Sequence, residues 1–376
     1  MSAYGIYLHV PWCVRRCPYC AFYVERDVGA DWDRFLDALL REHRLRAIEF
    51  PGAAATVFLG GGSPSRMPLA HLKRLLDALP RAPGAEVSLE ANPEDIDAAW
   101  MAGALAAGVN RLSLGVQTLD VQHARTLGRG AGPDRARQVL DAARTAGFRS
   151  WSADLIFALP GQTLADLERD LDALLAYEPP HISLYGLTWE PGTPLHSAWQ
   201  RGRVRPADED TWAAMYDHLV ERLSAAGLAR YEVSNFARPG HACAHNQLYW
   251  TDTPYLALGP SAHGYAPSGR RWVNRPDAQA YLDAADPTDT SELPSPMQHA
   301  EDILVSVLRT PEGLPQGFLA ARTGYELDAA VVARLRTLGL LQADPQRVAL
   351  SHAGFPVADG VIRTLADGLV EPESAA

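Results

Sequence analysis

The sequence contains few cysteines and no long hydrophobic run. Four cysteines occur in 376 residues, and no apolar signal segment stands at the start, so we expect no secreted disulfide framework. The longest apolar runs are far too short to span a bilayer. We therefore expect a cytoplasmic protein without an integral membrane segment, and only peripheral membrane contact stays open.

Positive charge is also in short supply. The net charge is −11, which argues against a broad nucleic-acid surface, because such a surface needs clustered lysines and arginines. Hydrophobic residues make up 47% and charged residues 21%, as is ordinary for a globular chain. The length suits one large α/β domain with a smaller second one, and we expect no nucleic-acid partner.

Short apolar runs alternate with longer amphipathic stretches from residue 5 to about 190. This alternation is typical of repeated βα units on a parallel sheet. The expected strands cover 5–10, 56–60, 86–90, 111–116, 151–157 and 182–187. The clearest helix patterns cover 31–48, 69–79, 133–145 and 164–177. Six units predict an α/β fold with a partial (βα)6, TIM-like barrel rather than eight closed units.

The composition divides the chain into three predicted segments. The barrel covers 1–190, and 191–295 is an irregular extension rich in Pro, Gly and aromatic residues, with one good helix at 208–226. In 296–376, three short helices and a hairpin follow in an order that resembles a winged-helix module. Acidic residues outnumber arginines there, so we favour a helical packing domain over a DNA-binding one.

Three of the four cysteines, Cys13, Cys17 and Cys20, lie within eight residues directly after the first predicted strand. Three thiolates can hold three irons of a 4Fe-4S cube and leave the fourth iron open to an exogenous ligand. The alternative is structural zinc, which needs four protein ligands. His9 is the only histidine nearby, and it lies inside the strand pattern. We therefore favour a cluster over zinc.

Further polar motifs follow the other predicted strands. The run 60–63 (Gly-Gly-Gly-Ser) follows the second strand, Glu90 closes the third, Gln117 closes the fourth, and Asp154 lies in the fifth. Functional groups of a parallel barrel gather at the carboxyl ends of its strands. Alone, each motif is weak, because glycine runs usually form turns and strand-end carboxylates often cap helices. Together they predict one ligand site beside the cysteine loop.

Several of these motifs resemble the radical S-adenosylmethionine superfamily. The matching runs are Tyr7-Leu-His-Val-Pro-Trp-Cys13, Gly60-Gly61-Gly62, Glu90-Ala-Asn-Pro93, the run from Gly108 to Gln117, Leu127-Gly-Arg129 and Leu159-Pro-Gly-Gln162. Within the superfamily, they are similar to the group that contains oxygen-independent coproporphyrinogen III dehydrogenase and its heme chaperone relatives. The resemblance covers nearly the whole chain and implies that the three clustered cysteines ligate a 4Fe-4S cluster.

The resemblance also implies a site for S-adenosylmethionine, whose amino and carboxylate groups would chelate the open iron. Glu90 and Asp154 can accept bonds from an ammonium or from ribose hydroxyls, and Arg129 can pair with a carboxylate. On residue type alone, a surface role for Arg129 is about as well supported. The implied site residues are Tyr7, Tyr19, Gly61, Gly62, Ser63, Glu90, Gln117, Arg129 and Asp154.

Two departures separate this chain from the dehydrogenase branch of that group. The branch carries one more cysteine two residues past the triad, where this chain has Phe22. It also carries an N-terminal extension, whereas only four residues precede Gly5 here. Both departures favour the chaperone branch.

The run Cys243-Ala-His245-Asn-Gln-Leu-Tyr249-Trp250 resembles a motif of the chaperone branch that has been implicated in heme binding. The resemblance implies that His245 is an axial ligand of heme, with the aromatic residues as a stacking wall. Without the resemblance, a hydrogen-bonded core histidine is the better-supported interpretation. Weaker axial candidates are Cys243, His241 and His263.

Two functions therefore follow from the resemblance. The first is a heme chaperone that binds heme and transfers it to apoproteins, respiratory enzymes among them. Its implied cofactors are a 4Fe-4S cluster, S-adenosylmethionine and heme. The second is an enzyme of porphyrin biosynthesis, an oxygen-independent dehydrogenase that decarboxylates coproporphyrinogen III. The sequence leaves open whether S-adenosylmethionine is cleaved.

Overall fold

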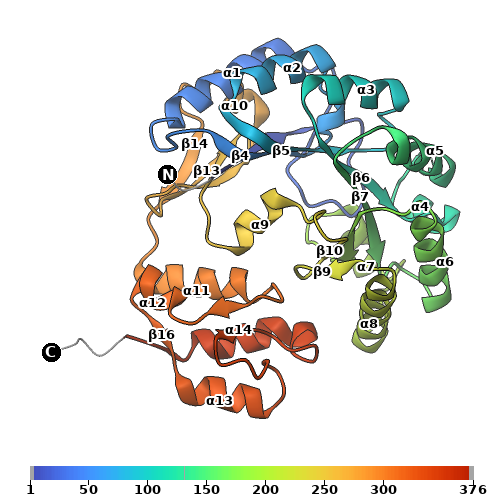
Figure 1. The fold of residues 1–376 in the computed structure, drawn as a ribbon. Coiled ribbons are helices and arrows are strands. Elements are labelled where there is room, and N and C mark those ends of the chain that lie inside the picture. Colours follow the sequence, from blue (N-terminus) through green and yellow to red (C-terminus); the bar gives the residue numbers. More distant parts are fainter. Residues whose placement is uncertain (1–3, 131, 372–376) are drawn as a thin grey trace.

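The computed structural model describes residues 4–130 and 132–371, and its centre is one mixed sheet of twelve strands (Figure 1). The strand order is β14-β13-β12-β11-β1-β4-β5-β6-β7-β8-β10-β9. Six consecutive strands of this order, from β1 to β8, are mutually parallel. The predicted α/β partial barrel is confirmed.

The parallel strands lie close to their predicted positions. They are β1 (Gly5–Val10), β4 (Ala54–Gly61), β5 (Arg81–Ala91), β6 (Arg111–Gln117), β7 (Ser150–Phe157) and β8 (His181–Gly186). Their side chains alternate with period two. In β1, for example, Ile6 and Leu8 are fully buried in the hydrophobic core, while Tyr7 stacks against Phe58 of the neighbouring strand on the other face. This alternation separates a hydrophobic outer face from a polar inner face.

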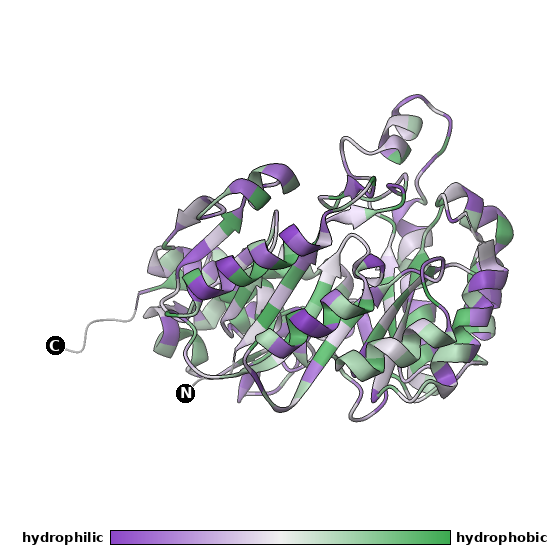
Figure 2. Cartoon of the chain, turned by 90° about the horizontal axis from the view of Figure 1, so that it is seen from above, coloured by the Kyte–Doolittle hydropathy of each residue, from purple (hydrophilic) through white to green (hydrophobic). Residues whose placement is uncertain are grey.

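Helices that connect the parallel strands cover the outside of the sheet (Figure 1). They are α1 (Trp32–Arg46), α2 (Leu69–Ala78), α3 (Ala98–Ala107), α4 (Val121–Thr126), α5 (Gly132–Thr145) and α6 (Leu164–Leu175). Side-chain caps fix several starts: Asp31 accepts from Arg34 N–H, and Thr163 forms a capping box with Asp166. Figure 2 shows largely hydrophobic central strands and helices of mixed hydropathy, as expected for amphipathic helices on a buried sheet.

The segment 191–295 is more regular than the sequence predicts, because it extends the sheet at both edges. Strands β9 (Ala229–Arg230) and β10 (Asn235–Ala237) extend the β8 edge. On the other side, β11 (Tyr255–Leu258) pairs in parallel with β1, and β12 (His263–Tyr265), β13 (Arg271–Asn274) and β14 (Thr288–Glu292) follow. The helices of this segment are α7 (Pro194–Gln200), α8 (Glu209–Ala225), α9 (Ala244–Trp250) and α10 (Ala278–Asp283). Residues of α8, β10, β11, β13 and α10 belong to the hydrophobic core of the barrel. The expectation of an irregular segment missed these pairings, which join residues far apart in sequence.

The C-terminal segment has a hydrophobic core of its own. It contains α11 (Pro296–Val307), α12 (Phe318–Thr323), α13 (Ala329–Thr337) and α14 (Ala358–Ala366), of which α14 was not expected. Two small ladders complete it: β15 (Leu314–Pro315) with β17 (Arg347–Val348), and β16 (Glu326–Leu327) with β18 (Leu369–Val370). The separate core supports the division near residue 296, which stays a proposal. Within the described residues, no helix is long and apolar enough to cross a membrane.

Candidate functional site

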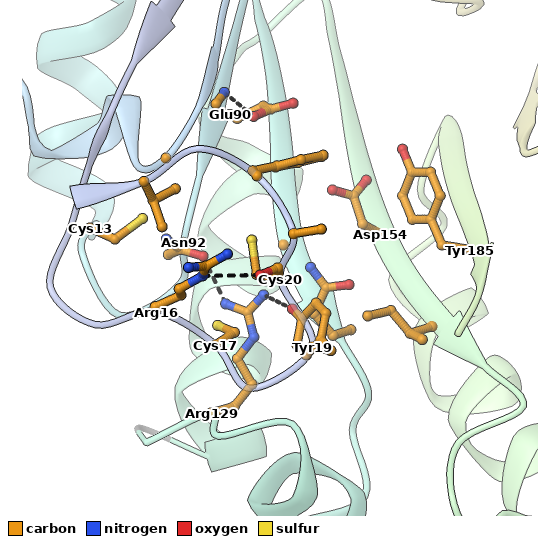
Figure 3. A pocket seen from close by; sticks show the side chains of 18 of the residues that line it. Cys13, Arg16, Cys17, Tyr19, Cys20, Glu90, Asn92, Arg129, Asp154 and Tyr185 are labelled. Carbon is orange, nitrogen blue, oxygen red and sulfur yellow. Dashed lines mark hydrogen bonds between the residues drawn. The ribbon is translucent and has the colours of Figure 1, made fainter. Parts of the chain in front are cut away.

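A cavity of about 560 Å³ opens at the carboxyl ends of the parallel strands (Figure 3). Its position follows from the parallel topology, which brings the end of each strand to one rim. Ten of the predicted site residues line it: Cys13, Cys17, Tyr19, Cys20, Gly61, Gly62, Glu90, Gln117, Arg129 and Asp154. The structure thus gathers residues from the ends of β4, β5, β6 and β7, from the cysteine loop and from the loop after α4 around a single volume.

Cys13 is the last residue of β2 (Trp12–Cys13), and Cys17 and Cys20 lie on the loop that leads from it to β3 (Glu25–Arg26). The loop turns at the Cys20 N–H, which donates to the Cys17 carbonyl (3.1 Å). The Ser63 hydroxyl donates to Cys13 Sγ at 3.4 Å. Burial raises the pKa of the Cys13 thiol to about 11, although Ser63 opposes this shift. Without a metal, the Cys13 thiol therefore keeps its proton.

The thiol set fits an iron–sulfur cluster better than a zinc ion. All three thiols are free, partly exposed and face the same cavity. Among the described residues, no group of three or more His, Cys, Asp or Glu side chains converges on one point as ligands of a single metal ion must. Zinc requires such convergence of four ligands. Cluster thiolates each bind a different iron, so they need only face one volume.

Two carboxylates, Glu90 and Asp154, face the cavity from β5 and β7 (Figure 3). Burial and the nearby Asp154 raise the pKa of Glu90 to about 8, against one opposing hydrogen bond from Gly61 N–H (3.2 Å). Burial also raises the pKa of Asp154 to about 6. Within the described residues, neither carboxylate forms an ion pair. A cationic ligand in the cavity would offset the cost of burying the two ionised carboxylates, and the ammonium and sulfonium of S-adenosylmethionine are such cations.

Arg129 does not point freely into the cavity. Its guanidinium donates to Asn92 Oδ1 (2.7 Å) and to the Tyr19 hydroxyl (2.9 Å), so it ties the cysteine loop to the end of β5 (Figure 3). Asn92 in turn donates to Ser63 Oγ (2.7 Å). These bonds set the position of the loop, and Arg129 would have to share its guanidinium with any ligand carboxylate.

Gln117 carries the most strained backbone in the site. It has φ +70°, in the left-handed region that side chains rarely adopt, and its buried Oε1 has no hydrogen-bond partner among the described residues. Both features make folding less favourable. Strained and unsatisfied residues of this kind are found mostly at functional sites, where they contact a ligand.

Two predicted residues lie behind the cavity wall rather than in it. The Tyr7 hydroxyl bonds His9 Nδ1 at 3.1 Å, and burial, with the charge of Glu90, raises the pKa of Tyr7 far above its ordinary value. Ser63 is 2% exposed and contacts Cys13 and Asn92. In this conformation Ser63 supports two residues that face the cavity, whereas Tyr7 bonds His9, which is not part of the lining.

His245 lies far from this rim, at the amino-terminal ends of the strands. It is 0% exposed on α9, and both ring nitrogens are engaged: Nδ1 with the Thr56 hydroxyl (2.7 Å) and Nε2 with the Tyr249 hydroxyl (3.0 Å). Its ring also stacks on Phe58. Burial lowers the pKa of His245 to about 3, so it is neutral. As it stands, His245 is a packed core residue, and an axial role would require α9 to move.

The weaker axial candidates differ in accessibility. Cys243 is 2% exposed at the start of α9, and burial raises the pKa of its thiol to about 12. His241 is half-buried with Nδ1 bonded to Ser150 Oγ (3.1 Å). His263 is exposed on β12. Of these candidates, His263 is the most exposed in this conformation, His241 is partly buried and Cys243 is buried.

Some cavity residues were not among those predicted. Asn92 lies in the quoted Glu90-Ala-Asn-Pro93 run, so the motif itself contained the signal. Tyr185 ends β8 just as Gln117 ends β6, and counting strand ends would have found it. Arg15 and Arg16 lie between the cysteines and line the cavity mouth. An arginine between cysteines has no sequence signature that separates this role from a solvent-exposed one.

Comparisons with known proteins agree with this geometry. The profile of the Radical SAM superfamily matches residues 7–174. The chain is 38% identical to "Heme chaperone HemW" of Mycobacterium tuberculosis, covering 96% of this chain and 94% of the relative. It is 33% identical to "Heme chaperone HemW" of Bacillus subtilis, covering 93% and 95%.

Among solved structures, the Escherichia coli coproporphyrinogen III oxidase HemN, described as a radical SAM enzyme, superimposes with a TM-score of 0.82 at 21% identity. The match covers 97% of this chain and 90% of that one, and at this identity it shows a shared fold. The identity to the HemW proteins extends well beyond the profile match. The chain therefore belongs to the radical SAM superfamily, in the group that contains the HemW proteins.

Proposed function

We propose that this protein is a heme chaperone that binds heme and transfers it to apoproteins. The observation that carries the proposal is the 38% identity to a HemW heme chaperone over 94% of that relative's length. Phe22, exposed at 63% where the dehydrogenase branch has a further cysteine, points the same way. Heme-accepting apoproteins, respiratory enzymes among them, are the proposed partners, and a cytoplasmic location stays a prediction.

In this proposal, Cys13, Cys17 and Cys20 hold a 4Fe-4S cluster in the mouth of the 560 Å³ cavity. When bound and reduced, such a cluster would supply an electron to S-adenosylmethionine. The residues of the chain bind and orient that ligand: Glu90 and Asp154 neutralise its positive charge, and the Gly61 and Gly62 backbone lets it approach the sheet closely. The unpartnered Gln117 Oε1 would accept one of its donors.

The proposed heme site includes α9, and His245 is its predicted axial ligand. Because both His245 nitrogens are bonded inside the core, heme can reach the imidazole only after α9 shifts enough to release it from Thr56 and Tyr249. One contact that would have to yield lies just past α9, where Asp252 accepts from His299 (2.9 Å) and Arg322 (2.9 Å) of the C-terminal helices. Movement of the C-terminal segment would therefore loosen α9.

A second function is coproporphyrinogen III dehydrogenation, which the HemN-like fold favours. The cavity is open and lies beside the cysteine loop, so its volume would admit a substrate near the cluster. This alternative does not explain the level of identity to the HemW proteins.

One experiment separates the two functions. The purified protein is reconstituted anaerobically and titrated with heme and S-adenosylmethionine, while heme absorption, 5′-deoxyadenosine release and coproporphyrinogen III consumption are followed. A chaperone binds heme stoichiometrically and leaves coproporphyrinogen III unchanged. Turnover of coproporphyrinogen III without saturable heme binding would overturn the chaperone proposal.

A further inference from the structure

A second cavity, of about 240 Å³, lies at the floor of the barrel, at the opposite end from the cysteine loop. Its wall combines the amino-terminal ends of β4, β5, β6 and β7 with residues of α9. The polar and charged residues that line it are Thr56, Glu86, Asn110, Arg111, Arg149 and Ser150. Neither the cluster nor the S-adenosylmethionine site uses any of them.

Arg111 is the unusual member of this wall. The residue is only 4% exposed, yet its guanidinium makes one hydrogen bond, from Nη1 to the His241 carbonyl (2.8 Å). Its buried Nη2 has no partner among the described residues. A buried charged donor without an acceptor is costly, and an anion in the cavity would satisfy it.

A second arginine, Arg149, enters the same cavity from the residue before β7. Its side chain is exposed, and neither Arg149 nor Arg111 forms an ion pair within the described part of the chain. Two arginines without an ion-pair partner among the described residues, at one small cavity, are unexpected in a chain with net charge −11.

The one acidic group of the wall, Glu86, is already engaged by α9. Its carboxylate accepts from the backbone N–H groups of Ala244 (3.2 Å) and His245 (3.1 Å), and the Cys243 thiol lies 3.4 Å away. Glu86 therefore holds the start of α9 and forms no ion pair with either arginine among the described residues.

The wall of this cavity is in direct contact with the predicted heme ligand. Thr56, which lines the cavity, holds His245 Nδ1, and Glu86 holds the His245 backbone. Leu248 of α9 lines it as well. An imidazole released from Thr56 would thus lie beside the arginines.

We propose that this floor cavity is a carboxylate-binding site that takes the propionates of heme when α9 carries it, an inference that rests on the proposed function. Pockets that hold a whole small molecule span about 300–1,000 Å³. This cavity is smaller, so it suits the carboxylate substituents of heme rather than the whole macrocycle. The macrocycle therefore stays outside, against α9, while its two carboxylates reach Arg111 and Arg149. Paired guanidinium–carboxylate bonds are the strongest that such groups make.

The test compares heme with heme dimethyl ester, in which both propionates are masked, by absorption titration of the full-length protein. Wild type should bind heme roughly ten-fold or more tightly than the ester, the effect of one charge-assisted hydrogen bond. Arg149→Ala should lower the ratio of the heme affinity to the ester affinity about three-fold or more, because it removes one of the two guanidinium partners. Arg111→Gln should narrow it further.

Arg144→Ala is the matched control, since Arg144 is an exposed arginine on α5 that pairs with Glu178 and does not line the cavity. It should leave the ratio unchanged. Equal binding of heme and ester by wild type, or equal effects of the Arg149 and Arg144 variants, would overturn the inference and leave the chaperone proposal standing. Failure of wild type to bind either compound would overturn the chaperone proposal as well. A further outcome is that heme and ester bind equally, while inorganic phosphate raises the thermal stability of wild type but not of Arg149→Ala. In that case the site takes a free anion, and the assignment to heme is wrong.

Discussion

The two ends of the barrel carry similar polar side chains but differ in whether these side chains have hydrogen-bond or ion-pair partners. At the carboxyl end, Glu90 faces an open cavity without an ion-pair partner in the described chain, and Gln117 Oε1 is unpartnered. At the amino-terminal end, His245 is sealed, with a hydrogen bond on each nitrogen. Unsatisfied polar groups mark an end built to receive a ligand, whereas satisfied ones mark an end built to hold the fold together.

This comparison explains why two motifs of similar appearance behave differently. The cysteine loop and the α9 motif both combine metal-ligating residue types with aromatics. The first follows the carboxyl end of a strand and stays open, while the second packs beneath β4 and β5 (Figure 1). Arg111 departs from this pattern at the floor, because its buried Nη2 has no hydrogen-bond partner among the described residues, and the floor cavity is therefore worth testing.

The largest expected effect is at the cysteine loop. Cys17→Ala should abolish the cluster, because it removes one of only three clustered thiols and no other thiol lines the cavity. Iron and sulfide content after anaerobic reconstitution measures this. Cys243→Ala, which removes a thiol at the other end of the barrel, should keep the full content. Full iron and sulfide in Cys17→Ala would show that this end does not hold the cluster.

His245→Ala should test whether the floor is structural. We expect a loss of about 3 kcal/mol in the free energy of unfolding, because the variant opens a cavity and leaves the Thr56 and Tyr249 hydroxyls without their partner. Urea unfolding measures the loss. The control His263→Ala alters an exposed histidine and should change stability by less than about 0.5 kcal/mol. Equal stabilities for the two variants would contradict the structural role.

Glu90→Gln should weaken binding of S-adenosylmethionine to the reconstituted protein by about 1.5–3 kcal/mol, the cost of one charge-assisted bond. Asp154→Asn should act in the same direction. Isothermal calorimetry measures both, with Asp77→Asn, an exposed carboxylate that pairs with Lys73 on α2, as the control. Unchanged affinity in Glu90→Gln would remove this carboxylate from the site, provided that iron content is retained.

The smallest expected effect is a pH dependence of stability in the protein without ligand. The pKa of Glu90 is about 8 when folded and near its ordinary 4.5 when unfolded, so the folded chain binds more protons between these values. Stability should therefore fall as pH rises from about 5 to about 8. We expect about 1 kcal/mol, because water in the open cavity screens part of the shift. Urea unfolding measures it, and Glu90→Gln should flatten the dependence; an unchanged slope would assign it to other groups.

Much of the fold could be predicted from the sequence. Alternating apolar runs located the six parallel strands within a few residues, since each must bury one face regardless of its neighbours. The strands from 229 to 292 were missed as strands because they are short and pair with partners far along the chain. Helix α14 was missed because its apolar pattern is short and follows an irregular stretch. The apolar residues of the helix can be recognised as core residues only once the second hydrophobic core is known.

The functional site, like the fold, could be predicted from the sequence only in part. Motifs at strand ends identified Glu90, Gln117 and Asp154, because a parallel topology sends every such end to one rim. The sequence could not show that Arg129 is held by Asn92 and Tyr19, because those residues approach it only in the folded chain. The conformation of Gln117 was equally hidden.

The sequence by itself determined the partial barrel, the cysteine loop and the rim where polar residues gather, because strand period and strand order follow from local patterns. Only the tertiary structure decided which histidine is accessible, since burial depends on what packs above a residue. His245 and His263 look alike in sequence, yet one is closed in by Thr56, Phe58 and Tyr249 and the other faces solvent. The Arg111 Nη2, which has no hydrogen-bond partner among the described residues, is likewise a property of the fold, because this could be recognised only once every neighbour was in place.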